Sequence, residues 1–314
     1  MFDDISIFTG NANPALAKDI ARHLGGSLSS AFVSRFSDGE VRVKIEGNVR
    51  GKDIFVVQST CAPVNENLME LLIMLDALKR ASSARITAVL PYFGYSRQDR
   101  KDQPRVPITA KLVANLLSTA GADRVLMMDL HAAQIQGFFD IPADHLYAVN
   151  TFVDYFMSKD MDMSNLVVVS PDVGGIKMAR GYAKRFKAGL AIVDKRRNSP
   201  DSVESKHVLG DVKGRTCIMV DDIIATGGSL VSAANILKDH GAEDIYAAIS
   251  HGVLSGNAVE NIEKSVIKEL VITDSIPYTQ EKSDKIIVTS IAPVLAEAIK
   301  RIHEEKSISI LFDV

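Results

Sequence analysis

Short, strongly apolar runs alternate with longer amphipathic runs along most of the chain. Apolar runs without polar alternation are typical of strands buried on both faces, and apolar residues three or four positions apart are typical of helices. In the first half this pattern predicts strands at 54–58, 86–91 and 125–129, and helices at 67–80 and 109–119. The alternation of strand and helix indicates parallel βαβ units.

The second half of the chain repeats this rhythm. The unit at 54–90, a strand, a loop, a helix and a strand, is matched by a similar unit at 216–250. The predicted strands are 166–170, 190–194, 216–220 and 244–250, and the predicted helices are 174–186 and 229–240.

The strand rhythm pauses at 137–149, and we expect the domain boundary at the end of this pause. The expected fold class is α/β, with two similar domains, 1–149 and 150–303, each a mainly parallel sheet flanked by helices. The C-terminal tail, 304–314, is expected to pack back on the first domain.

Composition narrows the class of protein. Hydrophobic residues are 46% and charged residues 24% of the 314 positions, which is ordinary for a globular protein. The 36 basic and 39 acidic residues give a net charge of −3, which argues against a nucleic-acid-binding protein. No apolar run could span a membrane, and the acidic start, MFDD, is unlike a secretory signal. The two lone cysteines, Cys61 and Cys217, fit free thiols in a reducing compartment, so we expect a cytoplasmic protein.

Two segments are polar and rich in turn-forming residues, SRQDRKDQPRVP at 96–107 and RRNSPDSVES at 196–205. Long polar insertions of this kind in α/β domains are either solvated surface loops or binding loops. The second is a candidate cover for a bound substrate.

The segment at 217–230, CIMVDDIIATGGSL, carries the strongest chemical signal. A buried strand leads into a loop of small residues and then into a helix, whose first N–H groups have no intrahelical partner. Gly227 and Gly228 let the backbone approach a ligand closely, and Thr226 or Ser229 can cap the helix. Such a loop at a helix N-terminus suits a phosphate monoester.

Two acids, Asp221 and Asp222, stand where this loop leaves the strand. Their carboxylates can accept hydrogen bonds from vicinal hydroxyl groups, such as those of a ribose. An acidic strand end with a glycine turn would be a sufficient interpretation of either feature alone. The acids, the small residues and the capping hydroxyl together indicate a site for a phosphorylated ribose.

This segment resembles the phosphoribosyl-pyrophosphate-binding motif of the type I phosphoribosyltransferase fold. Other motifs follow one another along the chain: RFSDGE at 35–40, PYFGYSRQDR at 91–100, MDLH at 128–131, SPDVGG at 170–175, IVDKRR at 192–197 and LSG at 254–256. Together they look like the ribose-phosphate pyrophosphokinase family, and they extend over essentially the whole chain.

The resemblance implies two phosphoribosyltransferase-like domains, the first binding ATP and the second ribose 5-phosphate. It implies transfer of the diphosphoryl group of ATP to the C1 hydroxyl of ribose 5-phosphate. The products are phosphoribosyl pyrophosphate (PRPP), which serves nucleotide biosynthesis, and AMP. The family also implies Mg²⁺ as the metal and a homohexamer as the assembly.

By resemblance, motifs of the first half bind ATP. Phe36 offers an aromatic face on which adenine can stack, and Asp38 and Glu40 can accept hydrogen bonds from the adenine amino group or from ribose hydroxyls. Arg97 begins the first polar loop, and its guanidinium suits phosphate oxygens. The residues assigned to ATP are Phe36, Asp38, Gly39, Glu40, Arg97, Gln98 and His131.

The resemblance places the metal and the catalytic groups at other strand ends. His131 follows one predicted strand and Asp172 another, and this pair is assigned to Mg²⁺. Lys195 and Arg197, two positions apart, are assigned to stabilising the transferring phosphoryl group. The residues assigned to ribose 5-phosphate are Arg197, Asp221, Asp222, Ala225, Thr226, Gly227, Gly228 and Ser229.

One departure from the family pattern leaves alternatives open. Position 225 is Ala, where many bacterial members are expected to carry Asp, and a non-catalytic regulatory paralogue would show such a loss. That paralogue should also have lost Lys195, Arg197, His131 or Asp172, and all four are intact. A transferase that consumes PRPP would lack the ATP motifs, and a PRPP-sensing transcriptional regulator would need an added DNA-binding module, which the sequence does not show.

Overall fold

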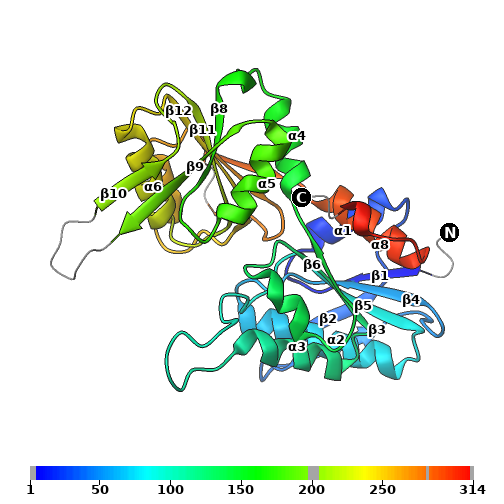
Figure 1. The fold of residues 1–314 in the computed structure, drawn as a ribbon. Coiled ribbons are helices and arrows are strands. Elements are labelled where there is room, and N and C mark those ends of the chain that lie inside the picture. The colour runs from blue at the N-terminus through cyan, green and yellow to red at the C-terminus, as the bar shows by residue number, and fades with distance from the viewer. Residues whose placement is uncertain (1–4, 197–204, 281–282, 312–314) are drawn as a thin grey trace. The chain divides into compact units, whose positions relative to one another are not determined.

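The computed structural model describes residues 5–196, 205–280 and 283–311 and divides into two compact units. The first unit contains the described residues up to Tyr147, together with Ser275–Pro277 and the segment from Ser290 onward. The second contains the described residues of Ala148–Asp274 and of Tyr278–Thr289. Both units are drawn in Figure 1, with most of their elements labelled.

The first unit is built on a parallel sheet with the strand order β1-β4-β5-β6-β7, and β2 and β3 form a separate antiparallel hairpin. The strands are β1 (Ile5–Thr9), β2 (Ala31–Arg35), β3 (Val41–Ile45), β4 (Asp53–Val57), β5 (Arg85–Leu90), β6 (Arg124–Met128) and β7 (Ala143–Leu146). The helices are α1 (Pro14–His23), α2 (Val64–Arg80), α3 (Thr109–Ala120) and α8 (Ala292–His303), with the 3-10 turns η1 (Ala133–Phe138) and η3 (Ser309–Leu311).

The strand sequences explain why this sheet is buried on both faces. The apolar runs of β4 and β6 are fully buried after their first residue, as expected where helices cover both sides of a parallel sheet. The amphipathic helix α2 buries Leu71, Met74 and Leu75 in the same core.

The second unit has the strand order β10-β9-β8-β11-β12-β13-β14, and all its pairs are parallel except β9 with β10. The strands are β8 (Leu166–Ser170), β9 (Gly189–Arg196), β10 (Ser205–Leu209), β11 (Thr216–Ile224), β12 (Asp244–Gly252), β13 (Glu269–Thr273) and β14 (Ile286–Thr289). The helices are α4 (Val149–Met157), α5 (Ile176–Phe186), α6 (Gly228–Asp239) and α7 (Ala258–Glu263), with the 3-10 turn η2 (Met163–Asn165).

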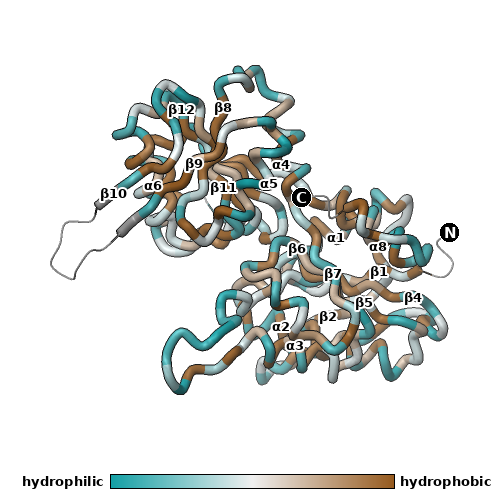
Figure 2. The backbone as a smooth tube through the Cα atoms, in the orientation of Figure 1, coloured by the Kyte–Doolittle hydropathy of each residue, from teal (hydrophilic) through white to brown (hydrophobic). Residues whose placement is uncertain are grey.

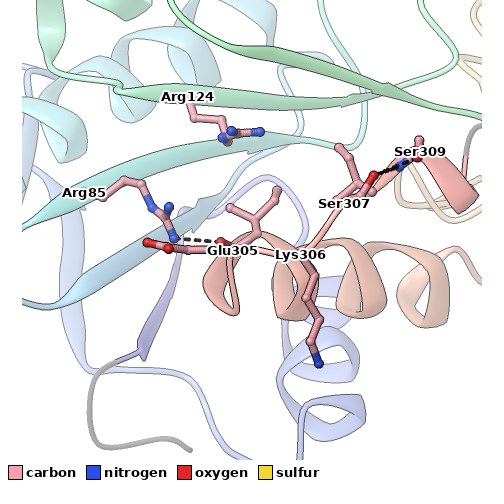
Figure 3. A pocket seen from close by; sticks show the side chains of 8 residues that line it. Arg85, Arg124, Glu305, Lys306, Ser307 and Ser309 are labelled. Atoms are coloured by element: carbon pink, nitrogen blue, oxygen red, sulfur yellow. Dashed lines mark hydrogen bonds between the residues drawn. The ribbon is translucent and has the colours of Figure 1, made fainter.

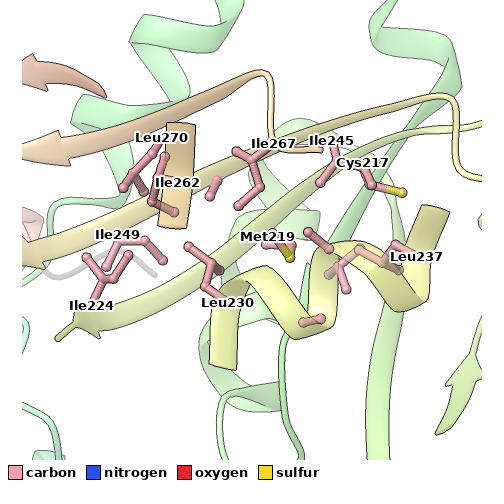
Figure 4. Packing of buried hydrophobic residues seen from close by; sticks show 14 of the residues in the cluster. Cys217, Met219, Ile224, Leu230, Leu237, Ile245, Ile249, Ile262, Ile267 and Leu270 are labelled. Carbon is pink, nitrogen blue, oxygen red and sulfur yellow. The ribbon is translucent and has the colours of Figure 1, made fainter. Parts of the chain in front are cut away.

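The core of the second unit lies between its central strands and helix α6. Figure 4 shows Leu230 and Leu237 of α6 directed toward Met219 of β11 and toward the neighbouring strands. This packing fixes α6 against the sheet, and so it fixes the position of the helix N-terminus relative to the end of β11.

The elements expected from the apolar pattern are all present, and the predicted α/β fold class with two mainly parallel sheets is confirmed. The ends differ by a few residues. The helix predicted at 67–80 begins at Val64, and the strand predicted at 216–220 continues to Ile224 because its pairing with β12 extends that far. The polar loop at 96–107 lies between β5 and α3 and is largely hydrophilic (Figure 2).

The prediction of a loop at 196–205 is wrong at both ends. Arg196 and Ser205 are paired across the antiparallel hairpin of β9 and β10. Composition could not predict this pairing, because the ends of the two strands are as polar as a loop. Antiparallel edge strands often have this polar composition. Residues 197–204 lie outside the described part of the chain.

Helix α8 belongs to the first unit, whereas the sequence analysis placed 292–303 in the second domain. It packs beside α1, and Arg85 of β5 donates a hydrogen bond of 3.0 Å to the carbonyl oxygen of Ile302. His303 lies 2.9 Å from a carboxylate oxygen of Asp53 in β4. The sequence pattern predicts an amphipathic helix but does not show on which sheet its apolar face packs.

The described part of the C-terminal tail, which ends at 311, also lies in the first unit. Arg85 and Arg124 line a cavity of about 460 Å³ together with tail residues that include Ser307 and Ser309 (Figure 3). None of the helices in the described ranges is long and apolar enough to cross a membrane.

Candidate functional site

The loop between β11 and α6 enters the helix through a glycine in the left-handed region. Gly227 is the N-cap of α6, with φ of +76°, and no side chain forms a capping hydrogen bond there. The predicted cap by Thr226 or Ser229 is therefore wrong, because the left-handed glycine itself turns the chain into the helix. The residues around it, Thr226, Gly228 and Ser229, are exposed.

The segment after β12 holds the carbonyl side of this loop. The backbone N–H of Ser255 donates to the carbonyl oxygen of Ala225 at 2.9 Å, and that of Leu254 donates to Ile224 at 3.2 Å. The side chain of Asn261 donates to the carbonyl oxygen of Thr226 at 3.1 Å. The LSG motif thus anchors the loop, while the first N–H groups of α6 have no intrahelical partner and suit an anion.

Two adjacent carboxylates, those of Asp221 and Asp222, lie in the C-terminal half of β11, two to three residues before the strand ends at Ile224. Asp222 is 8% exposed and Asp221 is half-buried. The backbone N–H of Asp222 donates to the Asp221 carboxylate at 2.9 Å. Burial, together with the negative charges of Asp222 and Asp172, raises the pKa of Asp221 to about 8. The acids therefore form a crowded negative site that favours protons, hydroxyl donors or a cation.

Asp172 follows β8, the strand next to β11 in the sheet. Its carboxylate accepts a hydrogen bond of 3.0 Å from the N–H of Gly175, and its carbonyl oxygen accepts one of 2.6 Å from Ser170. The residue is exposed. Because parallel strands end at the same edge of a sheet, this places Asp172 at the edge that also carries Asp221 and the loop between β11 and α6.

One of the two basic candidates for catalysis, Lys195, lies in β9. The backbone of Lys195 pairs with that of Lys206 in β10. Arg197 lies outside the described residues.

In the first unit, the turn between β2 and β3 displays the RFSDGE motif. Phe36 is 49% exposed, and the Arg42 guanidinium lies 5.4 Å from the centre of its ring. The N–H of Glu40 donates to the Asp38 carboxylate at 3.2 Å, and Gly39 has φ of +94°. The acids and the ring are thus presented to solvent from a tight turn.

The other ATP candidates follow β5 and β6. Arg97 is exposed. Gln98 is already engaged with the start of α3, because its carbonyl oxygen accepts from Ala110 at 3.2 Å and its side chain accepts from the Thr109 hydroxyl at 2.5 Å. His131 is exposed on the turn after β6.

Sequence reasoning missed two residues beneath this turn. Asp129, the first residue of the turn, is 4% exposed. His145 of β7 is also 4% exposed and accepts a hydrogen bond from the N–H of Leu130 at 2.8 Å. The acid of the MDLH motif could have been singled out because it follows a strand. His145 belongs to no recognised motif, and only the pairing of β6 with β7 brings it to the turn.

A parallel sheet that ends in paired acids beside a glycine loop and an exposed helix N-terminus defines a phosphosugar-binding α/β protein. The comparisons with known proteins identify the family. A sequence model described as the N-terminal domain of ribose phosphate pyrophosphokinase matches residues 5–121, and one described as a phosphoribosyl synthetase-associated domain matches residues 197–313.

Curated relatives match over nearly their whole length. The ribose-phosphate pyrophosphokinase of Caldanaerobacter subterraneus subsp. tengcongensis is 58% identical over 99% of this chain and 98% of the relative. That of Clostridium tetani is 58% identical over 98% and 97%. The crystal structure of phosphoribosylpyrophosphate synthetase from Mycobacterium smegmatis superposes with a TM-score of 0.90 at 43% identity, covering 96% of this chain and 100% of that one.

The chain belongs to the ribose-phosphate pyrophosphokinase family. The prediction of an enzyme that produces PRPP for nucleotide biosynthesis is thereby confirmed. The assignment of individual residues to ATP, metal and ribose 5-phosphate stays a prediction, since the comparisons give no residue roles.

Proposed function

We propose that this chain transfers the diphosphoryl group of ATP to the C1 hydroxyl of ribose 5-phosphate, with AMP leaving, and that the residues predicted above perform the reaction. One observation carries the proposal. Asp221 and Asp222 lie close to the end of β11 at Ile224, and residues 225–227 alone join that strand to the exposed N-terminus of α6, so acids for a sugar and N–H groups for a phosphate come from one short segment.

The second unit binds ribose 5-phosphate. The 5-phosphate lies on the backbone of Ala225–Ser229, where N–H groups and the positive end of the helix dipole favour a dianion. Asp221 and Asp222 accept hydrogen bonds from the ribose hydroxyls. Residues in 254–261 donate hydrogen bonds to the carbonyl oxygens of the loop, and this keeps the N–H groups of the loop directed toward the ligand.

The first unit binds ATP. Adenine stacks on the exposed ring of Phe36, and Asp38, Gly39 and Glu40 line its polar edge. Arg97 contacts phosphate oxygens, and Gln98 contributes through the loop that it fixes at the start of α3. His131 completes this group of residues at the end of β6.

The residues fit Mg²⁺ as the metal. Magnesium prefers oxygen ligands and is usually held by one or two carboxylates, with waters and substrate phosphates completing its shell. Within the described ranges no group of three or more histidine, cysteine or acidic side chains could hold a metal, and such a magnesium site does not require one. In this proposal Asp172 would offer the ion a carboxylate oxygen and His131 would act through water, and Mg²⁺ would supply positive charge to neutralise the ATP phosphates.

Lys195 and Arg197 are the proposed catalytic cations. Phosphoryl transfer depends mainly on positioning and on neutralising the phosphoryl oxygens, and two cations only two positions apart in the sequence can supply positive charge to one group. Arg197 also contacts ribose 5-phosphate in this proposal.

The test is to incubate the protein with ATP, Mg²⁺ and ribose 5-phosphate and to measure AMP and PRPP. Equal amounts of the two products are expected, with no AMP when either Mg²⁺ or ribose 5-phosphate is omitted. AMP without PRPP would indicate transfer to water, and no AMP across a range of phosphate concentrations would indicate a non-catalytic relative.

We also propose a cytoplasmic homohexamer. The full-length similarity to ribose-phosphate pyrophosphokinases supports the assembly, and two buried free thiols, Cys61 and Cys217, suit a reducing compartment. Analytical ultracentrifugation of the active protein should give a mass of six chains, and a monomer that retains full activity would contradict this.

A further inference from the structure

The turn that carries His131 has an unusual backbone. Asp129, its first residue, has φ of +35°, a conformation that residues with a Cβ rarely adopt. A strained conformation of this kind persists only where the surroundings hold it, and it is found preferentially at functional sites.

Two consecutive hydrogen bonds from this turn to β7 hold it in place. The N–H of Asp129 donates to the carbonyl oxygen of Leu146 at 2.9 Å. The N–H of Leu130 donates to Nε2 of His145 at 2.8 Å. The second bond ends on a side chain rather than on a backbone carbonyl group.

The surroundings of His145 fix the orientation of its ring. The side chain is 4% exposed, and its ring centre lies 4.3 Å from that of Tyr147. Since Nε2 accepts a hydrogen bond, the ring proton of the neutral histidine is on Nδ1. Nδ1 lies 3.5 Å from the side-chain nitrogen of Gln136 in η1, and because both atoms then carry hydrogen this contact does not orient the ring.

From this geometry we propose that His145 is a positioning residue for ATP use, holding the turn so that His131 points toward the nucleotide. This rests on the ATP role given to His131 under the proposed function. His145 does not touch the substrate. It acts through the N–H of Leu130, the residue before His131. If Nε2 of His145 is removed, this N–H loses its acceptor and the strained turn is no longer held in place.

Two substitutions of His145 by an amide residue distinguish the positioning role from a purely structural role of a buried side chain. The side-chain oxygen of Gln can occupy the place of Nε2, whereas the oxygen of Asn reaches only the place of Nδ1. His145→Gln should therefore stay within about threefold of the wild-type kcat/KM for ATP, and His145→Asn should lose about tenfold, as for one buried hydrogen bond. KM for ribose 5-phosphate should change less than about twofold in both variants.

Leu117→Ala, in the same core but in α3, controls for a general loss of stability. It should lower Tm at least as much as His145→Asn and leave KM for ATP unchanged. Equal kinetics of the Gln and Asn variants, or an equal rise in both substrates' KM values, would overturn the positioning role. His131→Ala is measured alongside. If His131→Ala leaves the kinetics for ATP unchanged, the ATP role of His131 is wrong. If His131→Ala impairs these kinetics and the His145 variants do not, only the role of His145 is wrong.

Discussion

At the scale of single residues, the clearest electrostatic feature is the pair of acids at the end of β11. The pKa of Asp221 is raised to about 8, first by burial and then by the charges of Asp222 and Asp172. An unfolded chain ionises this carboxyl near 3.8, so between pH 4 and 8 the folded state keeps a proton that the unfolded state has lost. Stability contributed at this position therefore falls as pH rises through that window.

Asp221→Asn should remove this pH dependence, because a neutral side chain has no proton to lose. The variant's Tm, relative to that of the wild type, should be higher at pH 8.5 than at pH 4.5. Differential scanning calorimetry at both pH values measures the shift. Asp239→Asn, which removes an exposed acid of α6, serves as the control. A Tm difference for Asp221→Asn that is the same at both pH values would show that the carboxyl titrates normally.

The two glycines of the phosphate loop should separate folding from binding. Gly227→Ala places a Cβ at φ of +76° and should cost about 1 kcal/mol of stability. A Cβ at Gly228 would meet only Thr226 Oγ1, at 3.9 Å, so Gly228→Ala should leave Tm unchanged. It should nevertheless raise KM for ribose 5-phosphate tenfold or more, because the methyl group stands where the 5-phosphate approaches. If KM for ribose 5-phosphate is unchanged in Gly228→Ala, the 5-phosphate does not bind at this loop.

At the scale of elements, the apolar rhythm was sufficient to locate the buried strands and the helices, because burial on both faces leaves long apolar runs. It could not predict β10, whose pairing with β9 involves polar residues of the kind found in loops. It could not assign α8 to a unit, because the bonds from Arg85 and His303 join positions far apart in sequence. The motifs of the site could be recognised in the sequence. The left-handed cap at Gly227 and the hydrogen bond from Leu130 to His145 could not, because both depend on the fold.

The anchoring of α8 should depend on Asp53. Its carboxylate, 12% exposed, pairs with Arg85 and with His303. Asp53→Asn leaves a partly buried guanidinium without its counter-charge and should cost about 1–3 kcal/mol, seen as a Tm lower by several degrees. In the double variant Asp53→Asn with His303→Gln, the two losses should be less than additive.

Asp76→Asn breaks a matched ion pair on an exposed helix face. Asp76 and Arg80 in α2 have side chains that are 49% and 79% exposed. The fall in Tm should be much smaller than that of Asp53→Asn, because exposed pairs at this spacing contribute little. If Asp53→Asn is no more costly than Asp76→Asn, the contacts of Asp53 do not hold α8.

At the scale of the whole molecule, the two units have separate hydrophobic cores, and the proposed function gives each unit one substrate. Each substrate should therefore slow amide hydrogen exchange in its own unit. At a concentration of 100 times Kd a ligand stabilises the state that it binds by about 2.7 kcal/mol, which corresponds to roughly hundredfold slower exchange of amides that open globally.

Ribose 5-phosphate alone should protect amides of 221–231, and a non-hydrolysable ATP analogue with Mg²⁺ should protect the β2–β3 hairpin and the turn at 129–131. Mass spectrometry of exchanged peptides resolves both regions. Gly228→Ala should abolish the protection by ribose 5-phosphate and leave that by the ATP analogue intact, because its Cβ obstructs only the sugar-phosphate loop. If ribose 5-phosphate instead protected the β2–β3 hairpin in preference to the start of α6, the assignment of the two substrates to the two units would be reversed.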